Sequence, residues 1–372
     1  MEYAKDDLQR LVWGQAEQRA AQGDASYVRE LGSQLSDRHA AAVEQVRNYE
    51  RQLAHVVRVL AITPGRDSLV QLLQLLNEKR PTTTSSGVLP RFVASLLAEH
   101  RQVADLAATV FDRSTWDQLD ELRACLFHEL VLRGVDIDEL LPLRFWRYEL
   151  PGWHPLAWLP VHRRDFEADV DFPSRSIGGS AHGVPTGLPA EERVDPPTPR
   201  TSKRSTLRDI ATKDVHETIV AAVKAGNWGD CEASVFILDE AITPDRIPAL
   251  LPTLPMPCVD GLGPTDRFEI AVRPAAEIWR MLFATASMGG MYRGGVQGAY
   301  GRLWAWRSMA GLSGAPAGAS AEEVERQASR STWFHFEVDA EWFHNDIDAD
   351  YGIATLSPDR RRIAVLSATD TD

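Results

Sequence analysis

Cysteine is scarce in this chain, and no two cysteines have the spacing of a metal or disulfide motif. The 372 residues include 3 Cys, namely Cys125, Cys231 and Cys258, which lie far apart and form no CxxC pair. This usage argues against a disulfide framework and against a thiolate zinc knuckle. The chain therefore does not belong to the small, disulfide-stabilised class of secreted proteins.

Long apolar runs are also missing. No stretch reaches the roughly 18 consecutive apolar residues that suggest a membrane-spanning helix. Residues Met1–Asp7 contain no apolar segment of the kind found in signal peptides. We therefore expect no membrane partner and a cytoplasmic location.

Positive charge is in deficit. The sequence has 40 Lys and Arg against 53 Asp and Glu, a formal net charge of −13. A surface of that sign repels phosphate backbones, so nucleic-acid binding would need a local basic patch. The best candidate is Arg200, Lys203, Arg204 and Arg208, in a Ser/Thr/Pro-rich stretch without aromatic residues, which favours a solvated linker. Nucleic acid is not expected as a partner.

The composition predicts a folded protein, and the length of the chain predicts two domains. It is 44% hydrophobic and includes 11 Trp, and a chain of this length exceeds one ordinary hydrophobic core. Apolar residues at three- and four-residue spacing predict an all-α domain, a bundle or a helical-hairpin stack, over 1–171. A Pro/Gly/Ser-rich linker or long loop is predicted over 172–212, and an α+β domain over 213–372.

The predicted α+β domain alternates strands with helices and ends in an antiparallel hairpin. Pro274 is expected as the first residue of a helix that continues to about Met288. Another helix is expected from about Gly298 to Leu312. The predicted strands are Glu232–Leu238, Arg267–Val272, Trp333–Val338, Gly352–Leu356 and Arg362–Ala368.

Five stretches of the chain resemble a family of uncharacterised proteins from GC-rich soil bacteria of the actinobacterial type. These stretches are Leu122–Gly134, Leu250–Leu254, Leu282–Tyr292, Gly298–Ser308 and Ala364–Asp372. The resemblance covers most of the chain apart from the predicted linker. It implies one recurring architecture and carries no activity with it.

An acidic, histidine-bearing stretch near the C-terminus is a candidate divalent-metal site. Alternation along the strand puts His335, Glu337 and Asp339 on one face, and His344 and Asp346 follow shortly after. Imidazole with several carboxylates is a ligand set that suits a divalent cation. The alternative is a polar strand face and loop exposed to water.

A glycine-rich connection before the helix expected from about Gly298 to Leu312 is a candidate anion site. Gly294 and Gly295 would let the backbone approach a phosphate, with Arg293 and Arg302 supplying positive charge. Neither GxGxxG nor GxxxxGK[ST] is present. The alternative is a turn whose glycines allow close helix packing.

Other catalytic motifs are incomplete. His128 and Glu129 lack the second histidine of HExxH, so a surface or packing role is expected for His128. With no complete motif, the sequence favours an interaction or regulatory module with a protein partner. The alternatives are a metal-assisted hydrolase at the acidic, histidine-bearing face and a small-anion or nucleotide sensor at the glycine-rich turn.

Overall fold

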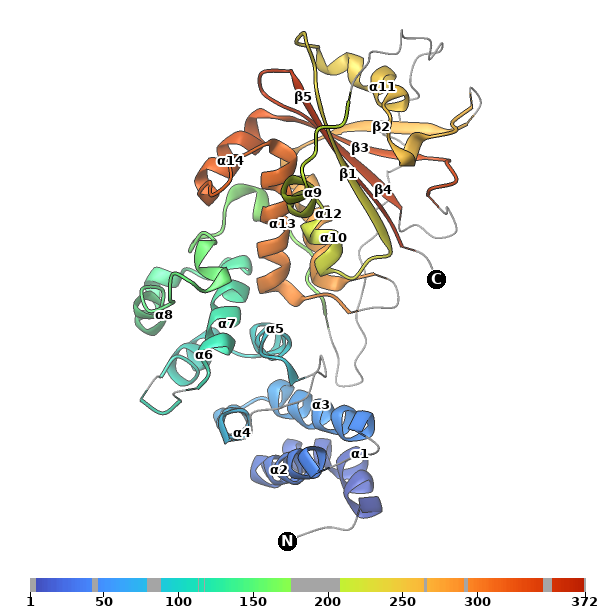
Figure 1. Cartoon of the computed structure of the whole chain (residues 1–372). Coiled ribbons are helices and arrows are strands. Elements are labelled where there is room, and N and C mark those ends of the chain that lie inside the picture. Colours follow the sequence, from blue (N-terminus) through green and yellow to red (C-terminus); the bar gives the residue numbers. More distant parts are fainter. Residues whose placement is uncertain are drawn as a thin grey trace.

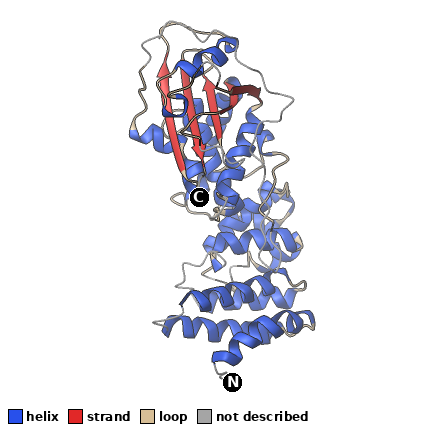
Figure 2. Cartoon of the chain, turned by 90° about the vertical axis from the view of Figure 1, so that its right-hand side faces the viewer, coloured by secondary structure: helices blue, strands red, loops and turns tan. Residues whose placement is uncertain are grey.

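The chain forms a helical half followed by a half built around one β-sheet, as predicted from the sequence. The computed structural model describes residues 5–41, 46–78, 88–112, 114–116, 118–174, 208–263, 266–290, 294–343 and 350–370. Helical layers lie at the N-terminal end and the sheet at the other (Figures 1 and 2). Within the described residues, no helix is both long and apolar enough to cross a membrane.

The N-terminal half consists of helices with short connections. They are α1 (Lys5–Ala21), α2 (Ala25–Ala41), α3 (Val46–Ile62), α4 (Arg66–Glu78), α5 (Pro90–His100), α6 (Val103–Thr109), α7 (Asp120–Leu132) and α8 (Leu141–Trp146). Apolar spacing explains them: in α4, Leu69, Leu72 and Leu73 lie on one face and are buried. The helices α1 to α4 stack in layers away from the sheet (Figure 1).

The C-terminal half contains a five-stranded antiparallel sheet, counted over the described residues, with the order β1-β5-β4-β3-β2. The predicted hairpin at the end of the chain is confirmed as β4 and β5. The strands are β1 (Asp230–Ile237), β2 (Phe268–Arg273), β3 (Thr332–Val338), β4 (Tyr351–Leu356) and β5 (Arg362–Thr369). The helices are α9 (Lys213–Ile219), α10 (Ala221–Ala225), α11 (Ile247–Leu250), α12 (Ala275–Met288), α13 (Gln297–Ser313) and α14 (Ala321–Arg330).

Each face of the sheet packs on a different layer. Alternation along β3 sends Phe334 and Phe336 into a smaller core with Leu251 and Val259, from the segment around α11. On the other face, α12 and α13 cover the sheet (Figure 1). The sheet is therefore buried on both faces.

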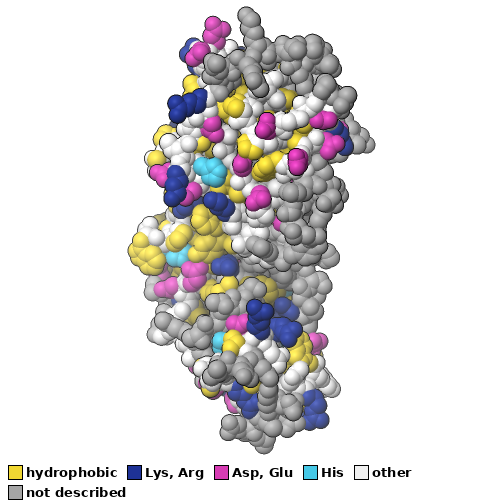
Figure 3. Space-filling model, turned by 45° about the vertical axis from the view of Figure 1, so that its right-hand side comes forward, with side chains coloured by type: hydrophobic (Ala, Val, Ile, Leu, Met, Phe, Trp, Pro, Cys, Tyr) yellow, Lys and Arg dark blue, Asp and Glu magenta, His cyan; other side chains and the backbone are white. Residues whose placement is uncertain are grey.

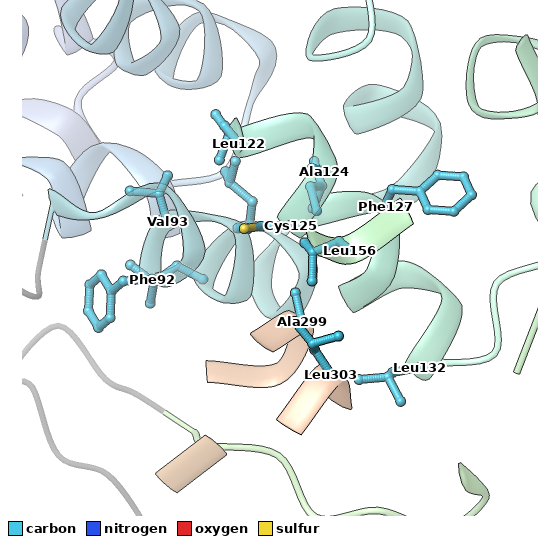
Figure 4. Packing of buried hydrophobic residues seen from close by; sticks show 14 of the residues in the cluster. Phe92, Val93, Leu122, Ala124, Cys125, Phe127, Leu132, Leu156, Ala299 and Leu303 are labelled. Carbon is cyan, nitrogen blue, oxygen red and sulfur yellow. The ribbon is translucent and has the colours of Figure 1, made fainter. Parts of the chain in front are cut away.

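One hydrophobic cluster runs without interruption from Leu8 of α1 to Ala368 of β5. Helix α13 joins the two halves because it contacts α5 and α7 on one side and β4 and β5 on the other. Figure 4 shows this contact, with Cys125 of α7 beside Leu156 and with Ala299 and Leu303 of α13 close by. The cluster crosses the predicted domain boundary, and the division into two domains stays a prediction.

A buried ion pair lies where the two halves meet. Arg302 of α13 contacts Glu167, which lies after α8 in the chain, at 2.6 Å between Nε and Oε1, and neither side chain is exposed. The remaining N–H groups of Arg302 donate to Glu167 Oε2, to His128 Nδ1 and to the carbonyls of Pro160 and His162. Every N–H of this guanidinium therefore has an acceptor.

Both oxygens of the Glu167 carboxylate also accept hydrogen bonds. Besides Arg302, its Oε1 accepts from Trp306 Nε1 at 2.6 Å and its Oε2 from the Arg164 amide at 2.8 Å. Its partners come from α13 and from the chain just before Glu167. A buried pair with its hydrogen bonds completed is what keeps two charges stable away from water.

The sequence interpretation is corrected at two places. Helix α14 was not expected, because its buried positions are the small residues Ala321, Val324 and Ala328. A start signal was present, since Ser320 accepts from the Glu323 amide as an N-cap. Pro274 lies at the N-cap of α12 and is not its first helical residue.

Removing Glu167 should destabilise the whole fold. Glu167→Leu leaves the Arg302 guanidinium buried and unpaired, and the expected loss is about 3–5 kcal/mol of unfolding free energy. Arg19→Ala, which removes an exposed pair with Asp24, is the control and should cost about 0–1 kcal/mol. Urea denaturation followed by circular dichroism measures both. Equal losses in the two variants would contradict this role of the buried pair.

Candidate functional site

The predicted metal set is only partly brought together. On β3, His335 and Glu337 point to the same face, with 4.0 Å between Nε2 and Oε1. Asp339 follows the strand, and its amide donates to the carbonyl of Arg267. His344 and Asp346 lie outside the described residues.

Glu269, an acidic residue that the sequence interpretation missed, lies on the strand next to β3. Glu269 of β2 pairs in register with Glu337, a neighbour that only the strand pairing reveals. Arg267 contacts Glu269 at 2.5 Å, and this hydrogen bond, with the nearby Glu337 and Asp339, raises the pKa of Arg267. Over the described part of the chain, no three His, Cys, Asp or Glu side chains are grouped so as to hold a metal ion.

His335 is a buried, neutral histidine. Its residue is only 2% exposed, and its Nε2 has no hydrogen-bond partner among the described residues. Burial, and after it the positive charge of Arg273, lower the pKa of His335 to about 3. The alternative of a water-exposed strand face therefore does not describe this residue.

At the predicted anion site, the glycine-rich turn folds back on α12. The amide of Gly295 donates to Met288 O at 2.8 Å, and the next amide, that of Val296, donates to Ala286 O at 2.9 Å. A Cβ on Gly295 would lie 2.5 Å from Ala286 O, which accounts for glycine at this close approach. Arg293 lies outside the described residues. The turn's amides at Gly295 and Val296 are used within the fold.

The N-terminus of α13 holds a carboxylate that belongs to the chain. Glu129 of α7 is fully buried and accepts from the Ala299 amide at 3.3 Å. Arg133 forms an ion pair with the same carboxylate. A Cβ on Gly298 would lie only 2.6 Å from Glu129 Oε1. The positive end of α13 is therefore neutralised internally, and Arg302 is held by Glu167.

Contacts with α13 explain why His128 and Glu129, the pair of the incomplete HExxH motif, occur side by side. Arg302 donates to His128 Nδ1 at 2.9 Å, and burial, followed by the Arg302 charge, lowers the pKa of His128 well below its usual value. Both residues of the pair face α13, as the packing role expected for His128 requires.

An exposed apolar surface lies on α8 and on the turn that follows it. Leu141 and Phe145 are four residues apart on α8, Tyr148 lies two residues after its end, and the three residues are 55%, 61% and 74% exposed. We call these three residues the α8 stripe. Farther along the chain, Trp153 is 81% exposed. In Figure 3, hydrophobic side chains gather at the left edge at mid-height, the height at which Figure 1 draws α8.

The opposite side of α8 anchors it to the core. Leu143 and Trp146 are buried, and the Trp146 ring lies 5.6 Å from both Phe111 and Phe127, measured between ring centroids. Such aromatic contacts fix the orientation of this short helix. The helix is thus apolar on both sides, and only one side is covered.

The architecture and the α8 stripe define a mixed helical and sheet protein with an uncovered apolar surface and no complete catalytic motif. Residues 10–372 match the model of a family of unknown function, DUF6183. The chain belongs to that family. No curated protein and no solved structure matches it.

The buried His335 should make stability depend on pH. The folded pKa of about 3 lies below the ordinary value of 6.5, so the unfolded chain binds the proton first and stability falls as pH drops below 6.5. Between pH 6 and 5, the unfolding free energy of the wild type should fall more steeply than that of His335→Gln, by about 1.4 kcal/mol per pH unit. Urea titrations at each pH measure the slopes, with exposed His162→Gln as control. Equal slopes for the wild type and His335→Gln would refute this assignment.

Glycines 294 and 298 should respond differently to alanine. In Gly298→Ala the new Cβ would displace Glu129, and the expected loss of about 1–3 kcal/mol is typical of overpacking. In Gly294→Ala the Cβ meets no atom within 4 Å, and a change within about 0.5 kcal/mol is expected. Thermal unfolding compares the two. A larger loss in Gly294→Ala would show that the glycines serve something other than packing.

Proposed function

We propose that this protein is an interaction module that binds another protein through the α8 stripe. The observation that carries the proposal is an apolar surface on a helix whose other side is buried. A contiguous exposed apolar surface is a feature of binding sites, since its contact with water is unfavourable. Tyr, Trp and Arg are also the residues enriched among those that dominate interface energies.

The stripe is rigid as well as exposed. Leu143 and Trp146 hold α8 against the core, and the guanidinium of Arg147 lies 4.6 Å from the Tyr148 ring centroid and binds Asp138 at 2.6 Å. Side chains already held in one arrangement lose little conformational entropy on binding. The layered helices α1 to α4 resemble in kind the stacks that other proteins use as binding scaffolds.

The alternatives from the sequence have less support. A metal-assisted hydrolase rests, within the described residues, on His335, Glu337 and Asp339, with Arg267 already countering the nearby acids. A small-anion sensor would need an anion to displace Glu129 from α13. We propose a protein as the partner, because the net charge of −13 disfavours nucleic acid, and we keep the cytoplasm as the proposed location.

A photo-crosslinking residue in place of Phe145 tests the proposal in the native host. A discrete crosslinked product is expected at Phe145, and it should disappear when Leu141→Asp is added, because the carboxylate makes desolvation of the stripe unfavourable. The same crosslinker in place of Trp13, which is 51% exposed on α1, is the control. An identical product from Trp13, or no product from Phe145, would contradict the proposal.

A further inference from the structure

We infer that helix α1 is an acid-released cover, which lies over the imidazole of His55 on α3 at neutral pH and separates from α3 as pH falls. The inference goes beyond the proposed function and does not depend on the α8 stripe. It rests on the placement of Trp13 and Glu17 of α1 against His55. It also rests on the position of α1 at the end of the helical stack (Figure 1).

His55 is buried beneath α1 without a hydrogen bond. The residue is 3% exposed, and neither Nδ1 nor Nε2 has a hydrogen-bond partner among the described residues. The Trp13 ring lies over the imidazole, with 4.4 Å between ring centroids and 32° between ring planes. Since Trp13 is itself 51% exposed, its ring separates His55 from water. Closure of α1 therefore removes water from both ring nitrogens and supplies no donor or acceptor in its place.

Closure becomes more unfavourable when the ring is protonated, because the cation has little compensation. Glu17 Oε1 lies 3.6 Å from His55 Nε2, beyond hydrogen-bond distance, and the Glu17 side chain is 53% exposed. Water therefore weakens its attraction for the ring. Arg58, one turn along α3, adds a like charge.

The direction of the pKa shift agrees with this geometry. Burial lowers the pKa of His55, the Glu17 charge raises it, and the Arg58 charge lowers it again. These are the charges that act on the ring. Over the described residues, no charged group of the other helices packed on α3, namely α2, α4 and α5, is among them. The effect of burial exceeds the attraction of Glu17, so a buried imidazolium opposes closure.

Helix α1 is also held by limited apolar contact. Within the described part of the chain, its extensive contacts are with α2 and α3. Its buried apolar residues are Leu8, Leu11, Val12, Ala16 and Ala20. Three of these are large and two are alanines, which bury little apolar surface. An element at the end of a stack can open locally at a lower free energy than the whole fold.

Proton linkage gives the direction and size of the switch. In the open form His55 contacts water and has its ordinary pKa of 6.5, whereas in the closed form its pKa is lower. The closed form is therefore fully favoured above pH 6.5, and protonation stabilises the open form as pH falls below that value. The ratio of open to closed molecules should rise by up to about tenfold per pH unit, until the pKa of the closed form is reached.

Hydrogen–deuterium exchange of the full chain, followed by mass spectrometry of peptides from α1 and α7, tests the inference between pH 7 and 5. After correction for the intrinsic exchange rate, the protection of α1 amides should fall severalfold more than that of α7 amides. In His55→Gln this additional loss should vanish, because the amide side chain does not titrate. His162→Gln, at a side chain that is 55% exposed, should retain it.

A second variant separates the switch from simple destabilisation. Glu17→Gln keeps His55 and removes the attraction that partly offsets burial, so α1 protection should fall more steeply with acidification than in the wild type. Glu30→Gln, the same charge change at an exposed site on α2, should leave the wild-type dependence unchanged. Circular dichroism at pH 7 confirms that each variant is folded.

Three results would overturn the inference. The first is a parallel loss of protection in α1 and α7 of the wild type, which would report global unfolding. The second is an additional loss that persists in His55→Gln, since another group would then control α1. The third is a dependence in Glu17→Gln that is no steeper than in the wild type or in Glu30→Gln, because the Glu17 charge would then not act on His55.

Discussion

The ion pair between Arg302 and Glu167 is the interaction on which the arrangement of the two halves depends. Moving either charge out of water is costly, and their attraction compensates only when the remaining hydrogen bonds are completed. Here they are: the guanidinium has an acceptor for each N–H, and the carboxylate accepts from Trp306 and a backbone amide as well. These requirements admit few geometries, so the pair fixes α13 against α7 and the segment that carries Glu167.

That geometry also decides which charged groups are available for function. Arg302 and the N-terminus of α13 would together form an anion site if they faced solvent. Glu167 binds Arg302 and Glu129 binds the N-terminus of α13, so both positive groups are neutralised inside the protein. The positive charges that stabilise the junction are thus unavailable to a ligand, and the exposed surface keeps its acidic character.

The sequence predicted the local structure well and the long-range pairing poorly. The alternation of Phe334 and Phe336 with His335 predicts β3 and its two faces, because side-chain direction repeats every two residues. Glu167 and Arg302 are separated by 135 positions and Glu129 and Ala299 by 170. No periodicity encodes such pairs, so the buried role of Arg302 was invisible and its charge suggested a ligand. The exposed stripe was equally hidden, since Leu141 and Phe145 have the composition of core residues.

The junction and the α8 stripe are connected by packing. Trp146 of α8 contacts Phe127, and the next residue on α7, His128, receives a hydrogen bond from Arg302. The buried face of α8 therefore packs directly on α7, the helix that the ion pair holds in place. A short helix of six residues would be only marginally stable alone, and its stability here comes from this anchoring. An apolar surface that stays ordered without a partner can bind with little further ordering, and this is what the proposed role of the α8 stripe requires.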